Sequence, residues 1–308
     1  MPGIVSGTRA IGPRGDCASP GGYSLCPVSS DPSTSDRLRS PMEIPASLGM
    51  HRASEAGGSV SMNDRELLRR NLARVRERIE SAAAAAGRPA PTLVAVSKTV
   101  DAIASRALLE EGVLDLGENR AAPFAEKADA LSGTFDGSEC EGPRWHFIGH
   151  LQRNKARRVL ERAHVIHSVD SSRLAEAITR ICGELGRAIE VFVEVNLTGE
   201  DRKHGHAPEG VGRTLDVLAA SPWVRVLGLM AMGPLDEREG ITTNSVFESA
   251  RSLASALELD RGEGTFHGGR CQLSMGMSGD LEAAIRNGAT HVRVGSALFE
   301  GLDDKHRR

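Results

Sequence analysis

Lys98 directly follows the apolar run 93–97 (LVAVS), which has the length and composition of a buried strand. A lysine whose aliphatic stem is packed and whose amine lies over a cavity can form a Schiff base with an aldehyde. The alternative is a solvated lysine at the end of a strand. The run does not decide between these two readings, so the decision depends on which other polar residues accompany Lys98.

Two segments late in the chain have the composition of an anion site. Ser278 lies in the glycine-rich segment 273–280 (LSMGMSGD). Gly295 and Ser296 end the next apolar segment, which also contains Arg293. Glycines let backbone N–H groups approach a ligand, and a helix predicted to begin just after Ser278 would point its N-terminal dipole at an anion. A plain N-cap role for Ser278 is the alternative, but the neighbouring Gly295 and Ser296 favour phosphate.

A Schiff-base lysine combined with a phosphate site indicates a phosphorylated aldehyde, and pyridoxal 5'-phosphate (PLP) is the obvious ligand. Asn119 follows another predicted strand and could donate a hydrogen bond to such a cofactor. Arg293 could either face the pyridine nitrogen or support the phosphate. An arginine at that nitrogen offers only donors and stays charged, so it would keep the nitrogen unprotonated and weaken the ring as an electron sink.

The elements that must position these residues alternate along the chain. We predict eight strands, at 93–97, 113–117, 145–149, 164–168, 189–195, 225–230, 271–275 and 291–295. Helical patterns lie between them, for example at 101–111, 171–185, 208–220, 244–258 and 279–287. This order predicts an α/β fold, a (β/α)8 TIM barrel, and polar residues at the strand ends fit its catalytic face. An open doubly wound sheet is the alternative, but no glycine-rich turn follows the first strand.

An extra helix precedes the barrel pattern, and a polar segment precedes that helix. Asn63 and Glu66 resemble a capping box, which predicts that the helix begins at Asn63 and ends near Gly87. Residues 1–62 are rich in Ser, Gly and Pro, and we predict a disordered leader there and a barrel domain over 63–308. A start of the protein at a later methionine and a functional tail are the two alternatives for the leader.

Composition limits the function classes. The 308 residues are 40% hydrophobic and 26% charged with a net charge of −3, which is typical of a globular protein and gives no support for nucleic-acid binding. The sequence contains no run of 18 apolar residues and no signal-peptide pattern, so we predict neither a membrane partner nor secretion. The five cysteines are scattered without a CxxC pair, so we predict a cytoplasmic protein. Few aromatic residues (3%) favour a monomer.

Three histidines lie near predicted strand ends: His146, His150 and His167. Their spacing matches no familiar metal-binding motif. We interpret them as packing or turn residues, and the sequence predicts no metal site.

Several motifs together resemble the pyridoxal phosphate homeostasis protein (PLP-binding protein) family. They are LVAVSKT at 93–99, GENR at 117–120, WHFIGHLQRNK at 145–155, HSVD at 167–170, GLM at 228–230, LSMGMSGD at 273–280 and VRVGS at 292–296. The resemblance covers residues 63–301 and implies a barrel like the N-terminal domain of alanine racemase. It also implies that Lys98 carries PLP and that five further residues contact it: Asn119, Ser278, Arg293, Gly295 and Ser296.

The resemblance further implies a PLP carrier without turnover, whose partners are PLP and the apo-forms of PLP-dependent enzymes. A PLP-dependent amino-acid racemase is the alternative. Such an enzyme needs a second base opposite the lysine, and the one tyrosine of this chain, Tyr23, lies in the predicted leader. Cys271 or a histidine could replace it in principle. A barrel enzyme that uses Lys98 as an aldolase-type Schiff base also fits the chemistry but not the motifs.

Overall fold

The computed structural model describes residues 59–132, 142–200, 203–262 and 264–308. The leader predicted for 1–62 therefore falls almost entirely outside the described residues, as do three of the cysteines. The other two, Cys182 and Cys271, are buried free thiols. None of the described helices is long and apolar enough to cross a membrane.

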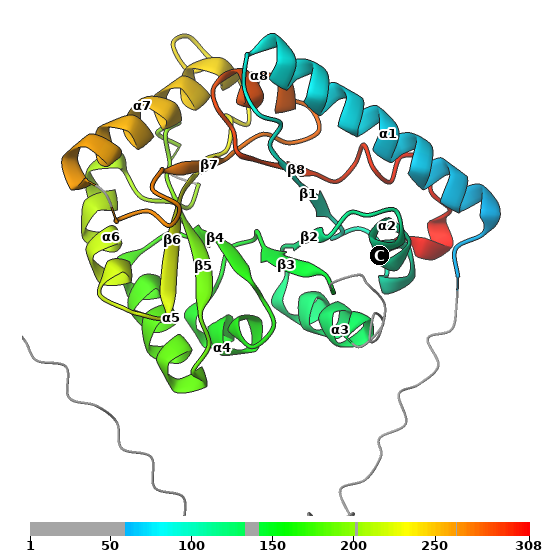
Figure 1. Ribbon diagram of the computed structural model, residues 1–308, viewed down its shortest axis with the longest axis horizontal. Helices are drawn as coiled ribbons and strands as arrows, with labels where there is room; N and C mark the ends of the chain where they lie inside the picture. Colours follow the sequence, from blue (N-terminus) through cyan, green and yellow to red (C-terminus); the bar gives the residue numbers. More distant parts are fainter. Residues whose placement is uncertain (1–58, 133–141, 201–202, 263) are drawn as a thin grey trace, which may run out of the picture. The chain divides into compact units, whose positions relative to one another are not determined.

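The strands form a closed parallel barrel in chain order, in which β8 pairs with β1 (Figure 1). They are β1 (Thr92–Val96), β2 (Asp115–Glu118), β3 (Arg144–Phe147), β4 (Val165–Val169), β5 (Ile189–Glu194), β6 (Val224–Met230), β7 (Gln272–Ser274) and β8 (His291–Val294). The predicted (β/α)8 barrel is thus confirmed. Every predicted strand is present, with no end shifted by more than two residues.

The helices lie outside the ring of strands (Figure 1). They are α1 (Met62–Ala85), α2 (Ala102–Glu110), α3 (Ala121–Leu131), α4 (Ala156–Leu160), α5 (Ser172–Leu185), α6 (Val211–Ala219), α7 (Thr243–Arg261) and α8 (Leu281–Arg286). One large apolar cluster fills the space between helices and strands. A smaller cluster is made by strand residues alone, and its members are Val165, Phe192, Leu227 and Met230.

Two predicted boundaries were wrong for local reasons. The N-cap of α1 is Ser61 and not Asn63, because the Ser61 hydroxyl accepts a hydrogen bond from the Asp64 N–H at 3.1 Å. The second strand begins at Asp115 and not at 113, because the Val113 N–H is taken by the carbonyl of Leu108 at the end of α2. The shift places Glu118 inside β2, where its carboxylate is buried.

Candidate functional site

A cavity of about 950 Å³ opens at the carboxyl ends of the strands, which is the face where barrel enzymes place their sites. Its wall includes all six residues singled out from the sequence: Lys98, Asn119, Ser278, Arg293, Gly295 and Ser296. Residues from β1, β2, β7 and β8 and the loops after them thus meet in one space. Apolar side chains complete the wall, among them Ile148, Met230, Met232 and Phe299.

Lys98 is the second residue after β1, following Ser97, and its side chain is exposed to the cavity. Within the described part of the chain its amine makes no hydrogen bond or ion pair. The residues after it are held by the C-terminal end of the chain, because the Arg308 N–H donates to the Thr99 carbonyl at 2.9 Å and the Asp101 N–H to the His306 carbonyl at 3.0 Å. A free amine on a fixed backbone is what a Schiff base requires.

A second lysine is buried beneath Lys98. The Lys127 ammonium of α3 forms an ion pair with Glu118 and donates to the Ser97 carbonyl at 2.7 Å, and both charged side chains are inaccessible to solvent. Burial lowers the pKa of Lys127, and the charge of Glu118 opposes that shift. Glu118 also accepts from the Asn119 N–H at 3.1 Å. This pair therefore fixes the backbone just before Lys98 and at Asn119.

Asn119 presents an unused hydrogen-bonding atom to the cavity wall. Its side-chain oxygen is buried and has no partner among the described residues, which is costly unless a ligand supplies one. Its backbone lies so close to Gly149 that a Cβ at Gly149 would sit 2.0 Å from the Asn119 carbonyl oxygen. Gly149 is therefore a glycine because the loop after β3 must pass directly against Asn119.

The loops after β7 and β8 contact each other at Ser278. The Ala297 N–H donates to the Ser278 hydroxyl at 3.5 Å, which brings Ser278 beside Gly295 and Ser296 as the sequence suggested. The predicted helix start near Gly279 is wrong. The carboxylate of Asp280 accepts from the Met277 N–H at 2.5 Å and forms a turn, so that α8 begins only at Leu281. Ser278 is thus not the N-cap, and the loops themselves, not a helix N-terminus, form this part of the wall.

The additional helix α1 holds these two loops from outside. The Asn71 amide donates to the carbonyls of Leu298 at 3.2 Å and Glu300 at 2.9 Å. Arg78 donates to the Ser278 carbonyl at 3.1 Å and binds the carboxylate of Glu282 through two nitrogens. The helix that the sequence shows as an N-terminal addition therefore positions the proposed phosphate loops.

Arg293 lies inside the barrel at the floor of the cavity, 5% exposed. Its guanidinium donates to the Ser274 hydroxyl at 2.6 Å and to the Ala231 carbonyl at 3.2 Å. Burial lowers the pKa of Arg293 to about 10, so it stays charged at neutral pH. These bonds hold the guanidinium against β6 and β7.

A chain of hydrogen bonds continues from Arg293 through the barrel interior. The Ser274 hydroxyl contacts His167 Nδ1 at 2.7 Å, His167 Nε2 contacts His146 Nδ1 at 2.9 Å, and His146 Nε2 contacts the Asp115 carboxylate at 2.8 Å. Asp115 is the first residue of β2, at the opposite end of the barrel from the cavity. The chain therefore links an arginine at the cavity to a carboxylate at the far face.

The direction of every bond in this chain follows from its two ends. Arg293 can only donate, so the Ser274 hydroxyl accepts from it and donates its own O–H to His167 Nδ1. His167 then carries its proton on Nε2 and His146 does the same, donating to Asp115. Burial lowers the pKa of both histidines, which keeps them neutral. Burial alone would raise the pKa of Asp115, but the hydrogen bond from His146 and nearby charges lower it below its usual value.

Glu194 is a cavity residue that the sequence analysis missed. It ends β5, is 4% exposed and lines the cavity. Burial and the negative charge of Asp170 raise the pKa of Glu194 to about 7, while Arg293 acts in the opposite direction. In the sequence it is the next-to-last residue of the predicted strand 189–195, and this position near a strand end was the available signal.

We expect the stability of the wild-type protein to depend on pH through Glu194, and we expect the Glu194→Gln variant to lack this dependence. Because the folded chain binds a proton at Glu194 up to a pKa of about 7 and the unfolded chain only to its ordinary value of 4.5, the free energy of unfolding falls as the pH rises between these values. The loss amounts to about 3 kcal/mol and persists at higher pH. Urea unfolding of both proteins across this range measures it. Parallel curves for wild type and variant would show that Glu194 is ionised with its ordinary pKa.

His150 and His204 also line the cavity. His150 had been interpreted as a turn or packing residue, and His204 had not been considered. The pair His204 and His206, two residues apart, was a signal in the sequence. In the structure the pair separates, because His206 turns to the Thr214 hydroxyl at 3.0 Å while His204 faces the cavity. By contrast, His146 and His167 lie in the barrel interior and pack there as predicted.

A family model and the curated relatives agree on the family that this chain resembles. Residues 70–303 match the model described as "Alanine racemase, N-terminal domain". The pyridoxal phosphate homeostasis protein of Pseudomonas aeruginosa is 38% identical over 235 residues, covering 76% of this chain and 95% of that protein. The protein of the same name from Escherichia coli is 35% identical over 244 residues, covering 79% of this chain and 98% of the relative.

Solved structures agree with this comparison. PipY of Synechococcus elongatus, determined with PLP bound, has a TM-score of 0.64 and 34% identity over 75% of this chain and 99% of its own. An unknown protein from Bifidobacterium adolescentis has a TM-score of 0.72 at 34% identity, covering 79% of this chain and 98% of its own. Alanine racemase of Clostridium difficile, at 16% identity and a TM-score of 0.58 over 80% of this chain and 59% of that one, shares the barrel fold.

Proposed function

The chain belongs to the pyridoxal phosphate homeostasis protein family, and on that basis we propose that it holds PLP as a Schiff base on Lys98 and serves as a carrier without turnover. PLP binding is the property of the family that the PLP-bound PipY structure illustrates. The finer statements, which concern the anchor residue, the contacts and the absence of catalysis, are argued below from this chain.

The unpartnered amine of Lys98 on the cavity wall is the observation that carries the proposal. Lys98 is the one lysine among the described residues that line the cavity. An amine without a carboxylate partner has no ion pair to break before it condenses with an aldehyde. The volume of about 950 Å³ is ample for a cofactor of this size.

The remaining wall fits the other parts of PLP. Ser278 and Ser296 supply hydroxyls, and Gly295 lets the last loop lie against β1, since a Cβ there would sit 3.1 Å from the Val96 carbonyl. We assign the phosphate to these loops. Asn119 has a free acceptor for the ring substituents. The Arg293 guanidinium is assigned to the pyridine nitrogen, because its bonds to Ser274 and Ala231 hold it at the floor of the cavity.

Borohydride reduction tests the anchor directly. The full-length protein is incubated with PLP, its visible absorption is recorded, and the reduced protein is digested for peptide mass mapping. We expect a pyridoxyl group on the peptide that contains Lys98. A protein that stays colourless and unmodified, or one modified at another lysine, would contradict the assignment.

A charge change at Ser278 tests the phosphate loops. We expect Ser278→Glu to weaken PLP retention strongly, because its carboxylate would repel the phosphate, whereas Ser278→Ala removes one hydrogen bond and costs about 1 kcal/mol. Retention is measured as the PLP that remains after gel filtration. The matched control Ser132→Glu, at the end of α3, should leave retention unchanged. Equal retention in Ser278→Glu and wild type would place the phosphate elsewhere.

The carrier role is distinguished from a racemase by proton exchange at the amino-acid α-carbon. Among the described residues no tyrosine lines the cavity, and the relatives are named for homeostasis. We expect no exchange of the α-hydrogen of alanine or other amino acids in deuterated water, followed by NMR. Exchange that disappears in Lys98→Ala would instead establish a PLP enzyme. Delivery of PLP to apo-enzymes in the cytoplasm, by a monomer, belongs to the same proposal.

A further inference from the structure

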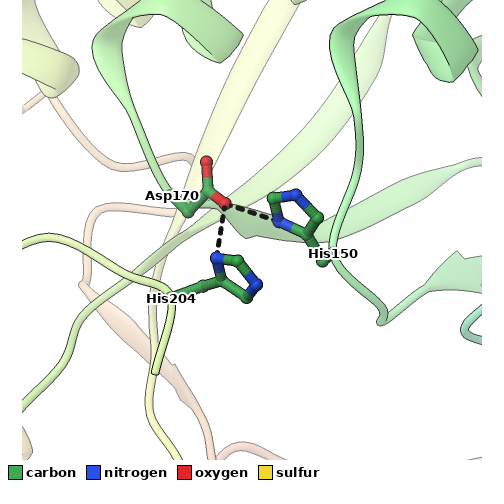
Figure 2. A group of neighbouring side chains, drawn as sticks. All are labelled: His150, Asp170 and His204. Atoms are coloured by element: carbon green, nitrogen blue, oxygen red, sulfur yellow. Dashed lines mark hydrogen bonds and ion pairs between the residues drawn. The ribbon is translucent and has the colours of Figure 1, made fainter. Parts of the chain in front are cut away.

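Two histidine side chains at the rim of the cavity converge on one carboxylate oxygen of Asp170 (Figure 2). His150 Nδ1 lies 2.8 Å from Asp170 Oδ2, and His204 Nδ1 lies 3.9 Å from the same oxygen. The two imidazole rings stack with their centroids 3.9 Å apart and an interplanar angle of 11°. One suitable ligand atom from each residue lies within 4.8 Å of the others.

Each of the three residues is placed by a fixed part of the barrel. Asp170 follows β4, and its second oxygen accepts from the hydroxyl of Ser171, the N-cap of α5, at 3.0 Å. His150 lies in the loop after β3, which Gly149 holds against Asn119. The cluster therefore combines ends of separate strands, as functional groups in a barrel do.

His204 comes from the loop after β5, which is tied on both sides of it. Before it, the Lys203 ammonium donates to the Gly233 carbonyl at 2.7 Å. After it, the His206 N–H donates to the Glu194 carbonyl at 2.8 Å. These bonds fix the backbone on which His204 faces Asp170.

The cluster makes chemical sense as a ligand set. A neutral imidazole ring offers a nitrogen lone pair to a metal ion. Two imidazole nitrogens and one carboxylate oxygen form a typical site for Zn²⁺ and similar ions, whereas Mg²⁺ and Ca²⁺ prefer oxygen alone.

The distances between the donor atoms are also close to those found around such an ion. Around a tetrahedral Zn²⁺ the donor atoms lie about 3.3 Å apart. The observed distances of 2.8 Å and 3.9 Å lie on either side of that value. The histidine side chains are 41% and 57% exposed, so small rotations can close the difference, while Asp170 is 11% exposed and fixed.

We propose that His150, Asp170 and His204 bind a divalent transition-metal ion of the Zn²⁺ type at the rim of the cavity. Three protein ligands leave a fourth position open. His150 and His204 belong to the cavity wall, so the open position faces the cavity and can take water or an anionic oxygen of a bound ligand.

Calorimetric titration of metal-free protein with Zn²⁺ tests the site. The full chain with Lys98→Ala is used after dialysis that removes any non-covalent PLP, so that PLP does not contribute a ligand and the result is independent of the proposed function. We expect about one ion bound per chain and much weaker binding of Mg²⁺. Cobalt(II) titration, followed by visible absorption, should show a band typical of tetrahedral coordination by nitrogen and oxygen.

Single substitutions decide whether these residues hold the ion. Asp170→Asn and His204→Asn should each weaken Zn²⁺ binding by roughly tenfold or more. The matched control is His267→Asn, an exposed histidine in the segment before β7 and thus at the other end of the barrel. Circular dichroism checks the fold, and the exposed His204 can be changed without touching the core. No Zn²⁺ binding by the parent protein, or equal binding by all variants, would overturn the proposal.

Discussion

Replacing Lys98 by alanine should abolish the reducible covalent adduct with PLP and leave the barrel folded. No other lysine among the described residues lines the cavity, so no neighbouring amine can take its place. The side chain is exposed and unpartnered, and its loss removes no packing, so the free energy of unfolding should change by less than about 1 kcal/mol. Peptide mapping after borohydride reduction measures the adduct, and urea unfolding measures the stability.

The control for Lys98 is Lys155→Ala, an exposed lysine in the 3-10 turn Arg153–Lys155 outside the cavity wall. It should retain the full adduct. Lys98→Ala can still hold PLP through the phosphate loops, so absorbance of free aldehyde that is lost on dialysis agrees with the proposal. A stable reduced adduct in Lys98→Ala would show that the anchor is another lysine.

Replacing Lys127 by methionine should destabilise the protein by about 3–5 kcal/mol, the usual cost of leaving one charge of a buried pair alone. Glu118 is 0% exposed and would lose its ammonium partner, and the Ser97 carbonyl would keep only the Val100 N–H as a donor. Denaturant unfolding measures the change. Because Ser97 precedes Lys98, PLP retention should fall as well, even though Lys127 does not line the cavity.

A double variant separates the destabilisation due to the unpaired Glu118 charge from the destabilisation due to losing the lysine side chain. Lys127→Met with Glu118→Gln removes both charges and keeps an acceptor for the Asn119 N–H, so it should recover at least about half of the lost stability. The surface control Lys305→Met, whose ammonium is half exposed beside Asp64 and Asp303, should cost less than about 1 kcal/mol. If Lys127→Met and Lys305→Met lower the free energy of unfolding by the same amount, the buried pair contributes no more to stability than a surface ion pair.

The sequence determined the barrel because its signals are local and repeated. Short apolar runs alternate with helical patterns eight times, and a parallel barrel buries each run on both faces without leaving an edge strand. For the same reason the residues that follow the runs, such as Lys98 and Asn119, could be placed at the cavity, because all strand ends of a barrel point to one face. The glycine and serine pattern of 273–280 located the loop of Ser278 in the same way.

The two wrong helix starts arose where a side chain overrode the local pattern. Asn63 had a Glu three residues later, but Ser61 caps α1 because its hydroxyl reaches Asp64. Gly279 and Asp280 looked like a helix start, but the Asp280 carboxylate bends back to Met277. Both outcomes depend on which of several competing hydrogen bonds forms, and short polar side chains offer several at once.

Tertiary structure alone decided which distant polar residues become partners. Asp115, His146, His167 and Ser274 come from four strands and form one oriented chain to Arg293 only because the barrel turns alternate side chains inward. The sequence analysis did not single out Lys127, whose ion pair with Glu118 forms only when α3 packs against β2. His150, Asp170 and His204 meet because three loops end at one rim. Periodicity in a sequence reports which face a residue occupies, but contacts across a closed sheet depend on register and loop path, which no local pattern records.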